Sequence, residues 1–241
     1  MIERYFDLYF FKSLFNTNDK VKEILKLQKQ NKNIALFSVK QEKGKGRKNR
    51  EWISKEGDLT CSFAIQKKLN VNDLGKINLF TIYSLINAFN KIGVEKNISY
   101  KWPNDILINK KKIAGVLIET NVSNSSINEC VIGIGVNFIS KIINSKFSSI
   151  SINDLAINSN ALNLFFLLIE CFDSFFENYS RIEFEKISRS LSTIFFDKKK
   201  NITINLGDHK IDGFFKEINS SGELLIQKHD EEVKINYGEI I

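Results

Sequence analysis

Residues 101–119 read KWPNDILINKKKIAGVLIE, and this stretch holds the only proline of the 241-residue chain and one of its two tryptophans. Proline fixes its own φ angle and biases the preceding residue towards an extended backbone, so Trp102-Pro103 sets the local direction of the chain. Two β-prone runs, 106–109 and 113–120, lie on either side of the turn residues Asn109-Lys110-Lys111. This pattern predicts a β-hairpin with a fixed entry.

The predicted hairpin carries residues that favour a binding site. Asn104 and Asp105 place an amide and a carboxylate where its first strand begins. Lys112 lies seven residues beyond Asp105, on the opposite strand, where it can face the same cavity. A lysine there is a compact positive charge suited to a carboxylate or phosphate oxygen, whereas the two lysines before it are better explained as exposed turn residues. Gly115 interrupts an apolar run and indicates close approach of a ligand.

A second unusual stretch, GKGRKNREW at residues 44–52, ends on the other tryptophan, Trp52, and holds four positive charges within six residues. Gly44 and Gly46 permit unusual φ angles and close backbone approach. Such a loop can fold over a polyanion with N–H groups and cations facing phosphate. It is not a P-loop, because no Gly-Lys-Ser/Thr follows at the required spacing. An exposed basic turn is the alternative interpretation.

A third stretch, VIGIGVN at residues 131–137, predicts a buried strand whose two glycines leave room beside it. A nucleotide-binding Gly-x-Gly-x-x-Gly motif also needs a third glycine and a following helix, and this stretch has neither. Taken alone, the stretch is better explained by core packing.

Hydrophobic periodicity around these stretches predicts an α+β fold, a mixed β-sheet with flanking helices followed by a small β-barrel. The strands predicted for the sheet are 2–15, 34–39, 59–65, 99–102, 106–109, 113–120 and 130–138. The predicted helices are 16–29, with its capping residues at 16–19, and 72–92, 161–176 and 181–193. We expect an exposed turn at 121–128 and a mobile loop at 139–151. The strands predicted for the barrel are 202–206, 210–218, 223–227 and 233–236, so the expected domains are 1–196 and 197–241.

The composition favours a globular protein with a substantial core, because 43% of the residues are apolar. The formal net charge is +7, which can attract phosphates but is as well explained by a solvated lysine-rich surface. Three cysteines lie far apart without a Cys-x-x-Cys pair, so the sequence indicates neither a zinc site nor a disulfide framework. Residues 1–7 are charged where a signal peptide is apolar, and the apolar run 162–169 is too short to span a membrane. We therefore expect a soluble cytoplasmic protein.

Together, the three stretches resemble the biotin–protein ligases, whose catalytic domain carries Gly-Arg-Gly-Arg-x-x-Arg-x-Trp, Lys-Trp-Pro-Asn-Asp with a later Lys-x-x-Gly, and Gly-x-Gly-x-Asn. The resemblance covers roughly residues 14–138, and the predicted barrel fits the SH3-like domain of the family. It implies a class II synthetase-like fold and a biotin–[acetyl-CoA-carboxylase] ligase of the monofunctional type. The implied substrates are biotin and ATP with Mg²⁺, and the implied partner is the biotin carboxyl carrier protein domain of a biotin-dependent carboxylase.

The resemblance also implies a site, position by position. The implied biotin-binding residues are Asn16, Thr17, Asn18, Gln41, Lys45, Gly46, Arg47, Lys112 and Gly115. The implied ATP-binding residues are Arg50, Trp52, Asn104, Lys112 and Asn137, and no protein-held metal is implied. The implied catalytic residues are Lys112 at the carboxylate and α-phosphate oxygens, Arg47 as a clasp over the adenylate, and Asp105 beside the incoming amine. The chain departs from the family pattern at Asn16, where serine is usual, at Lys45, where arginine is usual, and at 145–152, where no tryptophan is present to contact adenine.

Two alternative functions stay open at this point. A lipoate or octanoate ligase or transferase shares the fold class but needs a pocket for an aliphatic chain, and the 101–105 block argues against it. A nucleic-acid-binding regulator is the alternative of a different class. About 13 residues precede the first motif, too few for an N-terminal DNA-binding domain, so we expect none. The sequence leaves open whether the protein forms a homodimer.

Overall fold

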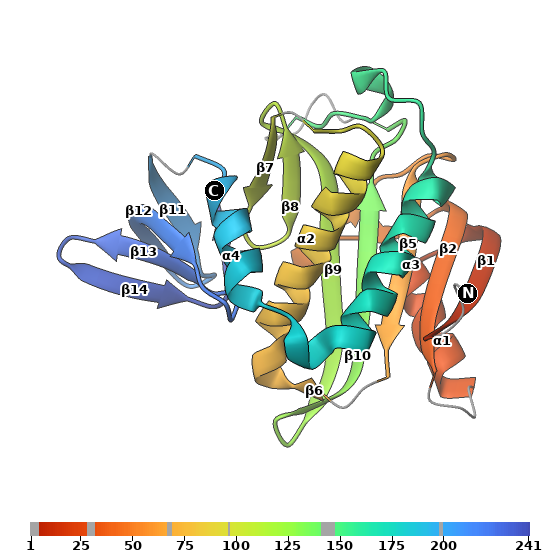
Figure 1. Ribbon diagram of the computed structural model, residues 1–241, viewed down its shortest axis with the longest axis horizontal. Helices are drawn as coiled ribbons and strands as arrows, with labels where there is room; N and C mark the ends of the chain where they lie inside the picture. The colour runs from red at the N-terminus through yellow and green to blue at the C-terminus, as the bar shows by residue number, and fades with distance from the viewer. Residues whose placement is uncertain (1–4, 28–31, 67–68, 96, 141–147, 198–199) are drawn as a thin grey trace.

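The computed structural model describes residues 5–27, 32–66, 69–95, 97–140, 148–197 and 200–241, and two large β-sheets organise them (Figure 1). The larger sheet has eight strands. In chain order they are β1 (Phe6–Leu14), β2 (Asn33–Gln41), β5 (Leu59–Ile65), β6 (Leu69–Asn70), β7 (Ile98–Lys101), β8 (Asp105–Ile108), β9 (Lys111–Ser123) and β10 (Ser126–Val136). In space the order is β1-β2-β5-β10-β9-β8-β7, with β6 paired to β10. The β1–β2 pair is parallel and the other pairs are antiparallel, which confirms the predicted mixed sheet.

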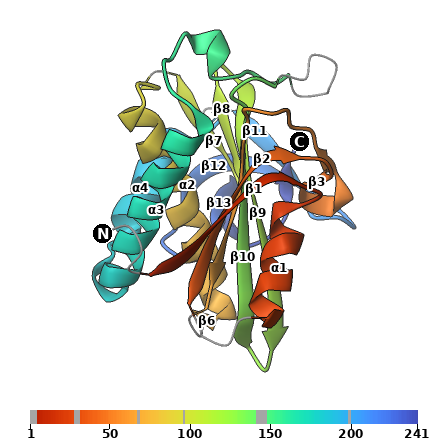
Figure 2. The same cartoon turned by 90° about the vertical axis from the view of Figure 1, so that its right-hand side faces the viewer.

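Helices cover both faces of this sheet (Figure 2). On one face lies α1 (Thr17–Leu27), whose Val21 packs in a small apolar cluster with Ile34 and Leu36 of β2. Ala35, between those two strand residues, belongs instead to the large cluster on the opposite face. Successive side chains of a strand point to opposite faces, so one strand supplies both cores.

The opposite face is covered by α2 (Leu74–Lys91) and α3 (Ala161–Asn178), with α4 (Phe184–Thr193) packed on α2. Phenylalanine fills much of this core. Phe63 of β5 stacks on Phe172 of α3 with ring centroids 4.6 Å apart, and Phe172 also meets Phe80 of α2 edge-on. Large aromatic side chains dominate core energetics, so aromatic packing holds α2 and α3 on this face of the sheet.

The smaller sheet is formed by the C-terminal residues. Its strands are β11 (Asn201–Asn205), β12 (Lys210–Ile218), β13 (Leu224–Lys228), β14 (Glu231–Ile235) and β15 (Glu239–Ile240), in the order β14-β13-β12-β11-β15. All its pairs are antiparallel. Among the described residues β14 and β15 do not pair with each other, so the predicted barrel is an open five-stranded sheet. Its likeness to an SH3 domain stays a prediction, as does the domain boundary near residue 196.

The smaller sheet packs directly against the larger one at the 101–105 segment (Figure 1). The indole of Trp102 donates a hydrogen bond to the carbonyl of Gly222 at 3.1 Å. Phe195, just after α4, stacks on Phe215 of β12 with ring centroids 3.7 Å apart and planes 5° from parallel. These buried contacts fix the smaller sheet beside the motif that the sequence singled out.

Most of the predicted elements are confirmed, and the 59–65 and 210–218 strands have the predicted bounds. The hairpin at 101–119 is confirmed as the β8–β9 pair, with Asn109 and Lys110 at positive φ in the turn. The predicted turn at 121–128 is too long, because β9 runs to Ser123 and β10 begins at Ser126, which leaves an exposed turn at 124–125. Most side chains of 121–128 are exposed and Ile127 is the single buried one, so these strand ends have no apolar alternation to reveal them.

Other differences concern short or irregular elements. β6 and β15 have two residues each, too few to produce a periodic pattern. The 40–58 loop contains a small ribbon of β3 (Gly44–Lys45) and β4 (Glu51–Trp52). A mobile loop was predicted at 139–151. Residues 141–147 of it lie outside the described part of the chain, so its mobility stays a prediction. No helix in the described ranges is both long enough and apolar enough to cross a membrane.

Candidate active site

A cavity of about 140 Å³ lies on the α1 face of the larger sheet, beside the 44–52 loop. The segments that line it come from the start of α1, the end of β2, the loop, the β8–β9 hairpin and β10. The residues implied by the family resemblance that line it are Asn16, Thr17, Asn18, Gln41, Lys45, Gly46, Arg47, Arg50, Trp52, Asn104, Asp105, Lys112 and Gly115. Asn137 does not line it. The structure therefore brings together three motifs that are far apart in sequence.

The glycines of β9 and β10 make space for two side chains at the floor of the cavity. A Cβ at Gly135 would lie 2.4 Å from the Trp52 ring, and one at Gly115 would lie 3.1 Å from it. A Cβ at Gly133 would lie 2.5 Å from Asn18 Oδ1. The room predicted beside the 131–137 strand is thus filled by an indole and an amide of the site, so its glycines serve packing within the site itself.

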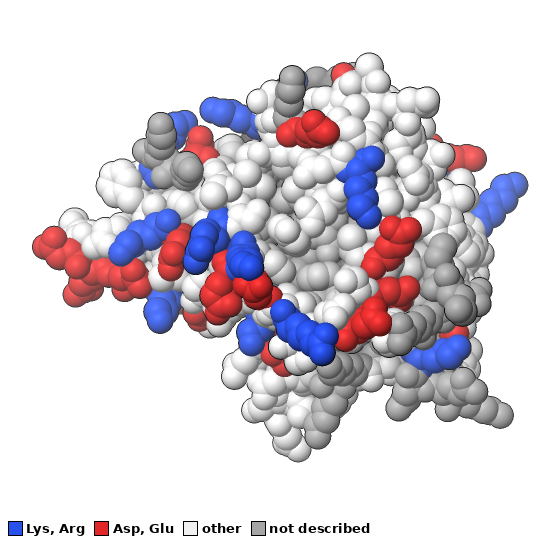
Figure 3. All heavy atoms as spheres, in the orientation of Figure 1, with Lys and Arg blue, Asp and Glu red and all other residues white. Residues whose placement is uncertain are grey.

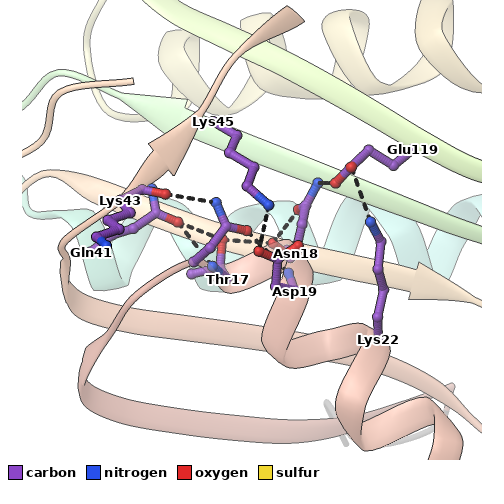
Figure 4. A network of polar contacts seen from close by, with 10 residues as sticks. Thr17, Asn18, Asp19, Lys22, Gln41, Lys43, Lys45 and Glu119 are labelled. Atoms are coloured by element: carbon purple, nitrogen blue, oxygen red, sulfur yellow. Dashed lines mark hydrogen bonds and ion pairs between the residues drawn. The ribbon is translucent and has the colours of Figure 1, made fainter. Parts of the chain in front are cut away.

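One end of the cavity is lined by neutral polar side chains of Thr17, Asn18 and Gln41, whose hydrogen bonds reach the carboxylate of Glu119 (Figure 4). Thr17 donates from its backbone N–H and its hydroxyl to Gln41 Oε1, at 2.9 and 3.1 Å. Ser62 Oγ lies 2.7 Å from Thr17 Oγ1 and 2.6 Å from Asn18 Oδ1, and Asn18 Nδ2 donates to Glu119 Oε2 at 2.7 Å. Thr17, Asn18, Gln41 and Ser62 are all buried. A satisfied network in a low-dielectric setting holds its members in one arrangement.

Two of the departures from the family pattern, Asn16 and Lys45, meet at one residue of α1, Asp19. Asn16 Oδ1 accepts the Asp19 backbone N–H at 3.0 Å, which caps α1, while its Nδ2 donates to Lys43 O at 3.1 Å. Lys45 Nζ lies 2.6 Å from Asp19 Oδ2, and this hydrogen bond raises the pKa of Lys45. Asn16 and Lys45 are therefore both engaged at the start of the helix.

The other end of the cavity is cationic. Lys112 Nζ forms an ion pair with Asp105 Oδ1 at 2.7 Å and lies 5.3 Å from the centroid of the Trp52 ring. Asp105 Oδ1 is buried, so this ion pair is shielded from solvent. The prediction that Lys112 and Asp105 face one cavity across the hairpin is confirmed.

Two arginines of the 44–52 loop extend the cationic end. Arg47 Nη1 donates to Asn104 Oδ1 at 3.3 Å, and Asn104 Nδ2 donates to Val116 O at 2.8 Å. Burial lowers the pKa of Arg47, although an arginine stays charged in proteins. Arg50 donates from Nε to Arg47 O at 3.2 Å and from Nη1 to Glu239 Oε1 at 2.7 Å. The loop thus presents its guanidinium groups to the cavity through contacts with two other parts of the chain.

Asn137 lies outside the cavity and supports it through hydrogen bonds to the backbone. Its Nδ2 lies 3.3 Å from both Lys112 O and Ile150 O, and its backbone N–H donates to Ile113 O at 2.9 Å. The Lys112 backbone is thereby tied to the end of β10. The contact with ATP that the resemblance implies for Asn137 stays a prediction, and the structure gives this side chain a role in holding Lys112.

The sequence did not single out Ser62, Cys61, Glu119 or Glu239. A hydroxyl inside the apolar strand 59–65 was the available signal for Ser62. Burial raises the pKa of the Cys61 thiol, so this cysteine of the cavity wall is not a thiolate nucleophile. Glu239 lies 189 residues from the arginine it contacts, and no local pattern could have revealed it.

The arrangement suits a particular kind of chemistry. Neutral donors and acceptors at one end can recognise an uncharged polar ring, while cations at the other can face a carboxylate and a polyphosphate. The cavity can therefore hold a small organic acid with its acidic end against a nucleotide. Bringing two anions together needs positive charge between them, and Lys112 lies at this end of the cavity.

Comparison with protein families agrees with this geometry. The model of the biotin/lipoate A/B protein ligase family matches residues 10–137. A curated relative, the biotin--[acetyl-CoA-carboxylase] ligase of Paracoccus denitrificans, is 30% identical over 95 residues, which are 39% of this chain and 40% of that protein. The bifunctional ligase/repressor BirA of Escherichia coli K12 is 26% identical over 204 residues, which are 80% of this chain and 61% of BirA. The chain thus spans about 40% to 61% of the length of these two relatives.

Solved structures extend the likeness to the whole fold. The biotin protein ligase from Aquifex aeolicus in complex with biotin and ATP superposes with a TM-score of 0.79 at 24% sequence identity, covering 98% of this chain and 97% of that one. The biotin protein ligase from Leishmania major in complex with biotin gives a TM-score of 0.68 at 19% identity, covering 95% and 98%. These neighbours share both the mixed sheet with its flanking helices and the C-terminal part.

Proposed function

Because the chain belongs to the biotin/lipoate A/B protein ligase family, we propose that it is an ATP-dependent ligase acting on biotin. It activates biotin as biotinyl-5′-adenylate and transfers the biotinyl group to a lysine of a biotin carboxyl carrier protein domain. The observation that carries the proposal is a single cavity with a neutral polar end, at Thr17 and Gln41, and a cationic end, at Lys112 and Arg47.

The neutral end explains the preference for biotin within the family. A ureido ring carries two N–H donors and a carbonyl acceptor, and the buried side chains of Thr17, Asn18 and Gln41, which line the cavity, offer matching groups. The aliphatic chain of lipoate or octanoate has no donor or acceptor for the hydrogen-bonding capacity that their mutual contacts leave over, and desolvating a polar group without a new partner costs about 1–3 kcal/mol. A site built this way discriminates strongly against an apolar substrate.

The first chemical step joins two anions at the cationic end. A carboxylate oxygen of biotin attacks the α-phosphorus of ATP, and the bond to the bridging oxygen breaks to release pyrophosphate. Lys112 lies between the two reacting groups and stabilises the charge that develops on them. Arg50, farther out on the loop, faces the departing phosphates, and Arg47 closes over the mixed anhydride to exclude water.

In the second step the ε-amine of the carrier lysine attacks the acyl carbon of the adenylate. The amide bond forms, the acyl–phosphate bond breaks, and AMP leaves with the electron pair. Asp105 is our candidate to orient this amine, because its carboxylate lines the cavity beside Lys112. We place the reaction in the cytoplasm, where the carrier domain of a biotin-dependent carboxylase would be its partner.

Mg²⁺ enters as part of the ATP substrate, since Mg²⁺ is usually held by phosphate oxygens together with one or two carboxylates. In the described part of the chain, no three His, Cys, Asp or Glu side chains lie together as a metal site.

On the face in Figure 3, lysines and arginines alternate with acidic side chains over the C-terminal sheet and do not form a continuous basic patch. A phosphate backbone is bound by clustered positive charge, so this face does not favour nucleic-acid binding as the main function.

The test is biotin-dependent exchange of labelled pyrophosphate into ATP, with lipoate and octanoate as competing acids. We expect exchange with biotin, and we expect neither competitor to support or inhibit it at equal concentration. Mass spectrometry of an added carrier domain should then show one biotinyl group on one lysine. Exchange driven by octanoate or lipoate instead of biotin would assign the chain to the other branch of the family, and exchange with none of the three acids would refute an adenylate-forming ligase.

A further inference from the structure

A carboxylate of the C-terminal sheet reaches into the cationic end of the site. Glu239, on β15, accepts a hydrogen bond from Arg50 Nη1 at 2.7 Å, and its other oxygen lies 3.9 Å from Lys48 Nζ. Its side chain is 20% exposed, whereas that of Arg50 is 54% exposed. The charge of Glu239 also acts on Arg47 and Lys101. One acidic side chain of the smaller sheet thus lies among cations of the 44–52 loop and near Lys101.

The contacts of Arg50 leave part of its guanidinium group available. A guanidinium carries five N–H donors in a planar fork. One, on Nε, donates to Arg47 O at 3.2 Å, and one, on Nη1, donates to Glu239. Two anchor points fix the plane of the group, and the other three donors remain for a ligand. Arg50 lines the cavity in this orientation.

The smaller sheet, which carries Glu239, is itself fixed against α2 and the 101–105 segment. The turn between β12 and β13 packs so closely on the first turn of α2 that a Cβ at Gly75 would lie 1.8 Å from Ser221 O. On the same side, Trp102 Nε1 donates to Gly222 O at 3.1 Å. The smaller sheet therefore offers its carboxylate from a defined position.

We propose that Glu239 is a positioning residue for ATP, which holds Arg50 with its free N–H edge towards the polyphosphate. The proposal rests on the proposed ligase function and adds to it that the C-terminal sheet completes the nucleotide end of the cavity. A carboxylate here could act in the opposite way, by occupying the cations until phosphate displaces it. The two roles give opposite signs for the effect of removing its charge on ATP binding.

The test compares Glu239→Gln with the unchanged full-length chain in pyrophosphate exchange, varying ATP and biotin separately. Glutamine keeps the size of the side chain and removes its charge. We expect the KM for ATP to rise about tenfold, the loss of one hydrogen bond between charged groups, while the KM for biotin changes by less than about twofold. Glu232→Gln is the matched control, because it removes the Lys216–Glu232 ion pair from the same sheet, outside the cavity.

A double-mutant cycle shows whether Glu239 acts through Arg50. With Arg50 replaced by alanine, adding Glu239→Gln should leave the KM for ATP unchanged, because the side chain it positions is already absent. An unaltered or lower KM for ATP in Glu239→Gln, or a full additional effect in the double variant, would overturn the proposal. A wild-type chain without any biotin-dependent exchange would instead refute the ligase function.

Discussion

The two ends of the cavity are built by different means. At the neutral end, Thr17 begins a helix, Gln41 ends a strand, and Ser62 sits in the middle of another, so hydrogen bonds join buried groups of regular elements. At the cationic end, Arg50 comes from a loop and is oriented by Glu239 of a separate sheet through a half-exposed ion pair. One end is fixed by the fold, and the other is assembled by contacts between charges.

This difference matches the demands of a two-substrate reaction. The ring of a small acid must be recognised by shape and by hydrogen bonds, which favours a rigid, dry end. A polyphosphate must be bound, transformed and released as pyrophosphate, which favours cations on a loop that can move between steps. Ion pairs near solvent are also screened by salt, whereas buried hydrogen bonds are not. Changes at the two ends should therefore separate in their kinetic effects.

The largest effect is expected at the point where the two ends meet. Lys112→Ala removes the cation between the biotin carboxylate and the α-phosphate, and the loss of one such group typically costs about 10²–10³ in rate. Pyrophosphate exchange should fall by at least this factor at saturating biotin and ATP. The measurement is initial-rate exchange with labelled pyrophosphate.

Lys111→Ala is the matched control for this variant, because Lys111 is the exposed neighbour on the same strand. It should exchange at close to the wild-type rate. Near-normal exchange in Lys112→Ala would remove this lysine from the chemical step. An equal loss in both variants would point to general damage to the hairpin.

A smaller effect, confined to one substrate, is expected at the neutral end. Thr17→Val keeps the shape but removes the hydroxyl that donates to Gln41 and lies beside Ser62, so Gln41 Oε1 keeps only the Thr17 N–H and Ser62 keeps only Asn18. The KM for biotin should rise by up to about tenfold, since one hydrogen bond contributes about 0.5–1.5 kcal/mol. The KM for ATP should stay within about twofold. Equal increases in both would show that the two ends are not independent.

A change at Glu119, where the hydrogen-bond network of the neutral end reaches solvent, should raise the KM for biotin by a smaller factor. Glu119→Ala removes the acceptor that orients the Asn18 amide, from a side chain that is 30% exposed. We expect the KM for biotin to rise about threefold, less than for Thr17, because water can replace this acceptor. Glu23→Ala, which breaks an exposed pair with Lys20 on α1, is the control and should leave both constants unchanged. A biotin KM that does not respond would place Asn18 outside recognition.

The sequence indicated the site better than it indicated the connections that hold the site together. The motifs at 101–119 and 44–52 were recognisable because rare residue types and glycines gather there, and the cavity contains nearly all of the residues they implied. Asn137 is the exception, because a sequence position does not show which way an amide at a strand end points. The 59–65 strand was predicted correctly, but its sequence could not tell that Ser62 bonds Thr17 and Asn18 of the cavity wall.

Long-range contacts were beyond any local pattern. Residue spacing within one segment determines which side chains share a face of a helix or strand, but it cannot say which surface of another sheet comes to rest there. Glu239 joins the site only because the smaller sheet packs on Trp102 and α2. For the same reason the sequence predicted a barrel where the structure has an open sheet. The edge strand β15 has only two residues, and its pairing with β11 leaves no pattern in the sequence.

The smallest expected effect uses pH to isolate the contact between the two sheets. Burial acts to raise the pKa of Glu239, but its hydrogen bond to Arg50 and the charges of Arg50, Lys48 and Arg47 outweigh this, so the net pKa is lowered below the ordinary 4.5. A carboxylate with a lowered pKa in the folded state stabilises the fold above its unfolded-state pKa, and this contribution is lost as the pH falls through the folded-state value. Wild type should therefore melt slightly above Glu239→Gln at pH 7, by no more than about 3 °C for a half-exposed pair.

At a pH well below 4.5 the two proteins should melt together, because a protonated glutamate and a glutamine are nearly equivalent. Other carboxylates also titrate there, but they do so in both proteins, so the difference in melting temperature reports on Glu239 alone. Scanning calorimetry of the pair between pH 3 and 7 measures this difference. A gap that persists at low pH would mean that the stabilisation does not come from the charge of Glu239, and a gap much larger than expected at pH 7 would mean that the contact holds the two sheets together and does more than orient one arginine.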